Sequence, residues 1–206
     1  MRGKRVQVLR SVTASRSRTE AGTSTAPDER ALIARIGSAD LGAFEELYRI
    51  YQPRLARFLG TQLRRPQVIE EVLDDTMMVV WQSAGRFRGA SKVSTWIFSI
   101  AYRKAIKARA RWPDPVEDDE LAFRSSDEPD PEREAGHRRL REALVRAMAG
   151  LSADHRAVVD LTYFHGLGYR EIAEIVNCPV DTVKTRMFHA RRRLKEALAG
   201  GLDDWI

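Results

Sequence analysis

The chain has 206 residues, with 35 Lys and Arg against 29 Asp and Glu, so its formal charge is +6. Hydrophobic residues make up 43% of it, enough for a buried core, but no apolar run approaches the roughly 18 residues that span a bilayer. The single cysteine, Cys178, excludes an internal disulfide framework, and residues 1–25 lack the apolar core of a secretory signal. The composition therefore predicts a cytoplasmic protein without membrane insertion.

The charge is unevenly distributed along the chain. Residues 1–30 carry 7 basic and 3 acidic side chains, and residues 31–111 carry 14 and 7. Residues 112–136 carry 2 basic and 10 acidic side chains, and residues 137–206 carry 12 and 9. Two basic segments therefore flank an acidic segment of net charge −8, which is also rich in proline. We expect four parts: a disordered basic tail (1–29), a helical domain (30–111), a flexible acidic linker (112–136) and a second helical domain (137–206).

Apolar residues recur at helical spacing throughout the first domain. A short helix is expected over residues 31–36 and a long one over 44–59, broken at most locally by Pro53. A third, over 68–81, has two adjacent apolar positions in each turn, and a fourth, over 93–111, becomes basic towards its end. Together these helices could form one small bundle.

The second domain has the same helical character. Helices are expected over residues 138–149, 154–164, 169–176 and 181–199. Because no segment of the chain shows sustained strand alternation, the sequence predicts an all-α fold made of two small helical domains.

The most specific local motif is GYREIAEIVNCPVDTVKTRM, which runs from Gly168 to Met187. Its first helix ends at Asn177, a residue that tolerates the left-handed conformation of a tight helix stop. Pro179 prevents that helix from continuing, and the charge of Asp181 suits the start of the next one. This punctuation is typical of a helix-turn-helix.

The second helix of this motif has two different faces. Val183, Met187, Ala190 and Leu194 form an apolar stripe, and the opposite stripe is left facing outward. Arg and Lys can donate hydrogen bonds to guanine and phosphate, and Phe188 can contact a thymine methyl group. The alternative, a basic face that is merely solvated, does not account for the turn residues and the split stripes together.

Taken together, these motifs resemble those of the bacterial extracytoplasmic-function (ECF) sigma factors, two-domain specificity subunits of RNA polymerase. Residues 43–55 (AFEELYRIYQPRL) resemble the opening helix of sigma region 2, and residues 70–81 (EEVLDDTMMVVW) its polymerase-docking helix. RFRG (86–89) and STWIF (94–98) resemble the promoter-melting segment, and the helix-turn-helix resembles the −35 reader of region 4. The resemblance implies promoter recognition and strand opening rather than catalysis.

The resemblance also assigns residues to three partners. Those implied to face the β′ coiled coil of core RNA polymerase are Glu71, Asp74, Asp75 and Met78. Those implied to bind the −10 strand are Lys92, Ser94, Thr95, Tyr102, Arg103, Lys104 and Lys107, whereas Trp96 lies on the apolar stripe and is expected in the core. Those implied to bind the −35 element are Tyr169, Arg170, Thr182, Lys184, Thr185, Arg186, Phe188, His189 and Arg191.

Four positions depart from the family pattern. Gly168 stands where Ser is frequent, and His189, which stands where a basic residue is frequent, either contacts a base or is a neutral surface residue. Lys104 stands where Asn is common, which affects the expected −10 base preference, and Asp181 stands where Gly is frequent and would repel phosphates. The resemblance also implies that the acidic linker threads towards the catalytic cleft and RNA exit channel of polymerase. The alternative is a charged linker that only keeps the two basic domains apart and soluble. Further implied partners are the β flap of polymerase, promoter DNA and an anti-sigma protein.

Two other classes of protein account for less of the sequence. A helix-turn-helix regulator that does not bind polymerase as a sigma subunit would explain residues 151–199 but neither the first domain nor the linker. An enzyme is disfavoured, because the chain has no P-loop, HExxH or nucleophile elbow. Its four histidines are scattered, so neither a metal site nor a cofactor is expected.

Overall fold

The computed structural model describes residues 28–112 and 142–202, and these are helical with no strand among them. The all-α prediction is confirmed. The predicted acidic linker and nearly all of the predicted tail lie outside the described residues, as does the start of the helix expected from residue 138.

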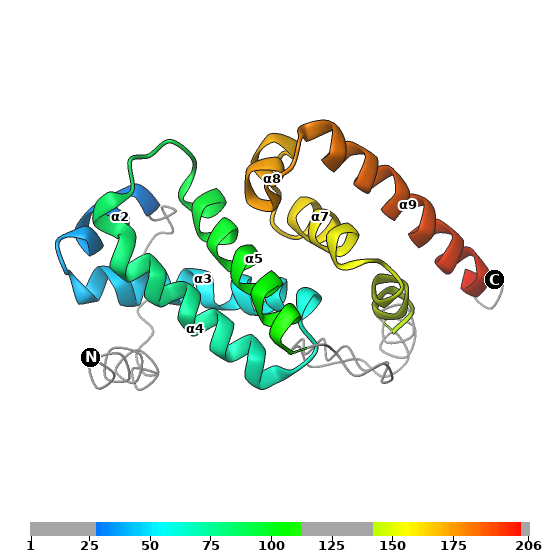
Figure 1. Cartoon of the computed structure of the whole chain (residues 1–206), viewed down its shortest axis with the longest axis horizontal. Coiled ribbons are helices and arrows are strands. Elements are labelled where there is room, and N and C mark those ends of the chain that lie inside the picture. Colours follow the sequence, from blue (N-terminus) through cyan, green and yellow to red (C-terminus); the bar gives the residue numbers. More distant parts are fainter. Residues whose placement is uncertain (1–27, 113–141, 203–206) are drawn as a thin grey trace, which may run out of the picture.

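The first half is a bundle of four helices and one short 3₁₀ turn (Figure 1). Its elements are α2 (Glu29–Gly37), α3 (Leu41–Gln62), α4 (Pro66–Ser83), η1 (Ala84–Arg86) and α5 (Val93–Arg111). Asp28 caps α2 through the N–H groups of Arg30 and Ala31, and Asp40 caps α3 through that of Ala43. Helix α3 continues through Pro53, so the expected long helix is one element.

The second half contains a helix over residues 142–149, then α7 (Ala153–Tyr163), α8 (Tyr169–Val176) and α9 (Val180–Leu202). The hydroxyl of Ser152 accepts from the N–H of His155 and so caps α7. Helix α8 ends at Asn177, whose φ of 50° and ψ of 56° are left-handed, as the sequence predicted. Pro179 then separates α8 from α9.

The two halves lie side by side, with α5 facing α8 and α3 facing α7 (Figure 1). Their buried apolar residues form one cluster, which runs from Leu32 in α2 to Ala190 in α9. Phe58 of α3 and Phe98 of α5 are fully buried, with ring centroids 5.4 Å apart in edge-to-face geometry. His165, which follows α7, packs against both rings. The structure is therefore a closed arrangement in which the halves share a core.

Candidate promoter and polymerase interfaces

The helix-turn-helix of α8 and α9 separates its buried face from its exposed face as the sequence predicted. Val183, Met187 and Ala190 are buried against α7 and α8, and Leu194 packs at the edge of the same cluster. On the other side of α9 the Phe188 ring is 64% exposed. A large exposed aromatic ring on a cationic helix is available for contact with a duplex.

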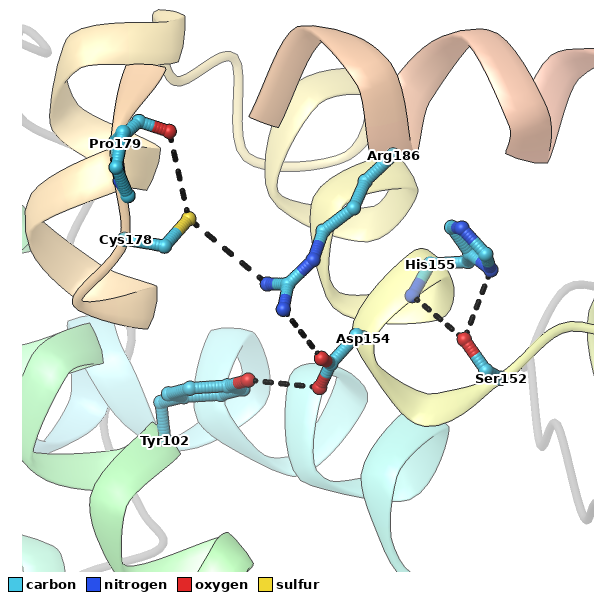
Figure 2. Close-up of polar contacts among 7 residues, drawn as sticks. All are labelled: Tyr102, Ser152, Asp154, His155, Cys178, Pro179 and Arg186. Atoms are coloured by element: carbon cyan, nitrogen blue, oxygen red, sulfur yellow. Dashed lines mark hydrogen bonds and ion pairs between the residues drawn. The ribbon is translucent and has the colours of Figure 1, made fainter. Parts of the chain in front are cut away.

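Most of the predicted −35 residues are open to solvent, but three are not. The exposed ones are Arg170, Lys184, Thr185, Phe188, His189 and Arg191. Tyr169, Thr182 and Arg186 are partly buried. Arg186 donates through its Nη2 to the carboxylate of Asp154, 2.6 Å away, and the Sγ of Cys178 lies 3.9 Å from its Nη1 (Figure 2). Cys178, the lone cysteine, is half-buried in the turn.

Asp181 has a partner within its own helix. Its carboxylate accepts from the Nζ of Lys184 at 2.9 Å, and its backbone carbonyl accepts from the hydroxyl of Thr185. The side chain of Asp181 is 89% exposed and lies in the first turn of α9, where the helix dipole stabilises a negative charge. In this structure Asp181 therefore holds one of the predicted DNA-binding cations.

The predicted −10 residues divide between exposed cations and buried hydroxyls. Lys92, Arg103 and Lys107 are exposed, and Lys104 is partly buried. Ser94, Thr95 and Tyr102 are 9%, 2% and 4% exposed, so these three are not open to a strand in this arrangement. Trp96, predicted as core, is partly buried and packs on Phe87 with ring centroids 4.9 Å apart.

Buried contacts alter the acidity of Tyr102. Its hydroxyl donates to Asp154 at 3.1 Å (Figure 2). Burial, followed by the negative charge of Asp154 and this hydrogen bond, raises the pKa of Tyr102 to about 12. The phenol therefore stays protonated and remains a hydrogen-bond donor at neutral pH.

The predicted polymerase-binding residues of α4 lie on a partly acidic face. Glu71 and Asp75 are exposed, Asp74 is half-buried, and Met78 is buried at 5% exposure. The hydroxyl of Tyr48 donates to Asp74 at 3.3 Å. Burial is the main cause of the raised pKa of Asp74. The hydrogen bond from Tyr48 lowers this pKa, whereas the nearby negative charges of Glu70 and Asp75 raise it further.

Asp75 also connects α4 to α5. Its carboxylate accepts from the Nζ of Lys104 at 3.0 Å, so a predicted polymerase contact and a predicted −10 contact pair with each other. Both side chains are partly exposed, and such pairs contribute little to stability. Lys104, the departure from the family pattern, therefore has a partner within the domain.

Three acidic residues that the sequence did not single out join the halves. Glu171 on α8 accepts from the Nζ of Lys92 at 3.0 Å and lies 3.5 Å from the hydroxyl of Thr95. Asp154 on α7 holds Tyr102, and Asp160, fully buried on α7, lies 3.9 Å from the Nε of Arg57 on α3. Each partner is distant in sequence, so no local spacing could have indicated these contacts.

The residues that the structure describes contain no group of three or more His, Cys, Asp or Glu placed to hold a metal ion. Nor does any helix among them have the length and apolar character needed to cross a bilayer.

Comparison with known proteins places both halves in one family. Residues 47–112 match the model of sigma-70 region 2, and residues 141–194 match that of sigma-70 region 4. An ECF RNA polymerase sigma factor, RpoE of Cereibacter sphaeroides, is 31% identical over 163 residues, covering 78% of this chain and 88% of the relative. The chain belongs to the ECF sigma factors.

Other relatives extend this agreement along the chain. The RNA polymerase sigma-H factor of Pseudomonas aeruginosa is 29% identical over 184 residues, covering 84% of this chain and 95% of that protein. The sigma factor RpoE of Bartonella quintana, solved with the anti-sigma factor NepR, is 25% identical, with a TM-score of 0.60 over 76% of this chain and 96% of that one. CnrH, solved with the cytosolic domain of CnrY, is 23% identical, with a TM-score of 0.61 over 84% and 97%, and shares the fold.

As an ECF sigma factor, the chain is an alternative sigma subunit that directs RNA polymerase to promoters. Sigma factors are transcription initiation factors, and a regulator that carries only the helix-turn-helix would not match region 2. The alternative of a regulator that does not act as a sigma subunit is therefore not favoured.

Proposed function

We propose that the three predicted residue sets divide the work of a sigma subunit. In this proposal α9 reads the −35 element, the 91–95 segment and α5 capture the −10 strand, and α4 docks on the β′ coiled coil of core polymerase. The main support is the division of α9, where Val183 and Met187 are buried while Lys184 and Phe188 are exposed.

The −35 surface would combine phosphate neutralisation with base contacts. Lys184 and Arg191 are exposed cations that can meet phosphates, and Thr185 and Phe188 can reach base edges from the same side of α9. Arg170, at the start of α8, would contact the DNA sugar-phosphate backbone next to the groove that α9 enters.

The −10 surface would combine cations with buried hydroxyls. Lys92, Arg103 and Lys107 can follow the phosphates of a displaced strand. Thr95 and Tyr102 could bond to an unstacked base, but only after their present carboxylate partners are removed.

The proposal also covers the domain boundaries, the acidic linker and the protein partners of the chain. A region 2 domain over residues 30–111 and a region 4 domain over 137–206, joined by the acidic linker, would place the linker in the polymerase cleft, where its charge resembles that of RNA. We further propose that the chain acts in the cytoplasm, has no catalytic activity of its own, contacts the β flap through region 4, and is held inactive by an anti-sigma protein.

The decisive experiment is transcription by purified core polymerase with and without the chain. Promoters are first identified by mapping the transcripts that rise when the protein is overproduced. We expect initiation at those promoters only when the chain is present. Initiation that is independent of the chain would contradict the proposal.

The polymerase contact is tested by assembly of the Asp75→Arg variant with core polymerase. We expect at least tenfold weaker assembly, since reversing one charge on the acidic face of α4 would disrupt its electrostatic complementarity with the docking partner. Lys104→Ala is the matched control, because it removes the same Asp75–Lys104 ion pair but keeps the carboxylate. Equal loss in both variants would assign the effect to that ion pair rather than to docking.

A further inference from the structure

The start of α9 carries two opposite charges side by side on the exposed stripe of the helix. The Oδ1 of Asp181 lies 2.9 Å from the Nζ of Lys184, and the two side chains are 89% and 59% exposed. Phe188 continues the same stripe one turn later at 64% exposure. A recognition helix directs the residues of its N-terminal end towards base edges. The pair therefore lies where the proposed function requires base contacts with the −35 element.

Phosphate binding does not explain the carboxylate of this pair. Asp181 stands where glycine is frequent in the family, and a carboxylate repels the phosphates of a duplex. Among the residues that the structure describes, Lys184 is the only polar partner of this carboxylate. Asp181 therefore fastens no other helix to α9, and its place on the stripe points to a group outside the protein.

The ion pair leaves hydrogen-bonding capacity free on both side chains. A carboxylate can accept several hydrogen bonds, and an ammonium group can donate several. Only one of each is used when Lys184 donates to Asp181. Because both side chains are largely exposed, the pair presents a free acceptor directly beside a free donor.

This arrangement is complementary to the major-groove edge of a cytosine–guanine pair. There the N4 amine of cytosine donates, and the O6 and N7 atoms of guanine accept. The N4 amine and O6 are joined by a Watson–Crick hydrogen bond, so they lie about 2.9 Å apart. The charged atoms of Asp181 and Lys184 have the same separation. Asp181 can therefore accept from the cytosine amine while Lys184 donates to guanine, and the ion pair is kept.

The other base pairs match this arrangement less well. An adenine–thymine pair also has an amine beside an acceptor, but its acceptors N7 and O4 lie on either side of that amine. Guanine instead places O6 and N7 side by side, where one ammonium group can donate to both. An inverted guanine–cytosine pair sets the carboxylate against the guanine acceptors. The Asp181–Lys184 pair therefore favours cytosine–guanine in one orientation.

We infer that Asp181 and Lys184 together read one cytosine–guanine pair of the −35 element, with Asp181 on the cytosine amine and Lys184 on guanine. Asp181 is then a specificity-determining residue, whose charge lowers affinity for every duplex but raises the discrimination among them. This inference rests on the assignment of α9 to the −35 element in the proposed function, and it adds the identity of one base pair that α9 recognises.

The test measures competition among promoter duplexes for RNA polymerase holoenzyme assembled with the full chain. The competitors are versions of a mapped promoter in which each −35 base pair is exchanged in turn for the three others. With the wild-type chain we expect one cytosine–guanine pair whose inversion weakens binding about tenfold, the order expected for a paired base contact.

Two alanine variants should change general affinity in opposite directions but weaken the same preference. Asp181→Ala removes a negative charge and should tighten binding to every duplex, whereas Lys184→Ala removes a positive charge and should weaken it. In each variant the penalty for inverting that one pair should fall to about threefold or less, with the other −35 preferences unchanged. Glu174→Ala is the matched control, since it removes an exposed carboxylate of α8 and should alter no base preference.

A modified base tests the contact at the level of atoms. N4-methylcytosine keeps its pairing with guanine but carries a methyl group in place of the free N4–H of the major groove. At the cytosine of that one pair it should weaken binding of the wild-type holoenzyme about tenfold. The Asp181→Ala holoenzyme should lose less than about threefold, because the acceptor is already absent.

Three results overturn the inference. Asp181→Ala keeps every wild-type base preference while tightening binding to all duplexes by one factor, which would leave the carboxylate acting only on phosphates. Alternatively, the two alanine variants change different base pairs, or the wild type discriminates among −35 sequences but at no cytosine–guanine pair. Each of these leaves the proposed function standing. A holoenzyme that discriminates at no −35 pair contradicts the proposed function itself, so the two failures are distinguishable.

Discussion

The imidazole ring of His165 lies 4.5 Å, centroid to centroid, from the ring of Phe98, so an aromatic contact joins the two halves. The Nε2 of His165 is also 3.1 Å from a carboxylate oxygen of Asp160, and the two side chains are 2% and 0% exposed. This single histidine therefore serves both the shared apolar core and the hydrogen bonding of a buried carboxylate.

Replacing His165 by alanine should be among the more damaging single changes. His165→Ala leaves a cavity beside Phe58 and Phe98 and removes a hydrogen-bond partner from buried Asp160, which together should cost about 3 kcal/mol of unfolding free energy. Urea unfolding followed by circular dichroism measures this loss. His189→Ala, an exposed histidine of α9, should change the same free energy by less than about 0.5 kcal/mol.

Neutralising Asp74 should stabilise the fold at neutral pH. The pKa of Asp74 lies above its ordinary 3.8 in the folded chain, mainly through burial, so the ionised carboxylate destabilises the native state at neutral pH. Asp74→Asn keeps an acceptor for Tyr48 and should unfold at a higher temperature than wild type at pH 7. The difference should vanish as the pH falls below 3.8, where both folded and unfolded wild-type chains are protonated. A lower unfolding temperature at pH 7 would contradict this account.

The pH dependence of Glu171 should have the opposite sign. Burial opposes its ionisation, but hydrogen bonds from Gly168, Lys92 and Thr95 outweigh it and hold the pKa below the ordinary 4.5. Its contribution to stability is therefore present above pH 4.5 and lost as the pH falls through the lower folded value. In thermal unfolding at pH 3 to 7, Glu171→Gln should be less stable than wild type at pH 7, and the gap should close towards pH 3. A gap that stays constant with pH would exclude this linkage.

Substitutions at Asn177, the left-handed residue between α8 and α9, should differ in their effect on stability. Asn177 has a φ of 50°, a region that glycine adopts freely and residues with a branched Cβ do not. Asn177→Gly should be nearly neutral, whereas Asn177→Val should cost about 2 kcal/mol. Chemical denaturation compares the two directly. Equal effects of glycine and valine would show that backbone strain at this position is unimportant.

Truncating the exposed ring of α9 should affect DNA binding but not folding. Phe188 is 64% exposed, so Phe188→Ala should change the unfolding free energy by less than about 0.5 kcal/mol. If the ring contacts a base, affinity for the mapped −35 duplex should fall about tenfold, and the loss should be smaller on a duplex of unrelated sequence. Glu196→Ala, an exposed change further along α9, serves as the control. An equal loss on both duplexes would remove Phe188 from sequence recognition.

The sequence alone determined the helical elements, because each depends on local features. The spacing of apolar residues predicted α3, α4, α5 and α9. Asn177 and Pro179 predicted the turn between α8 and α9. The buried and exposed stripes of α9 could also be predicted, since they follow from helical periodicity within a single element.

Only the tertiary structure decided how the two halves meet. The contact of Lys92 with Glu171 and that of Tyr102 with Asp154 each join residues from different halves of the chain. Such pairs have no periodic signal, since they depend on shape complementarity between whole helices rather than on spacing within one. The sequence therefore predicts which side chains can bind DNA, and the packing of α5 on α8 decides that several of them are occupied by carboxylates in the closed state.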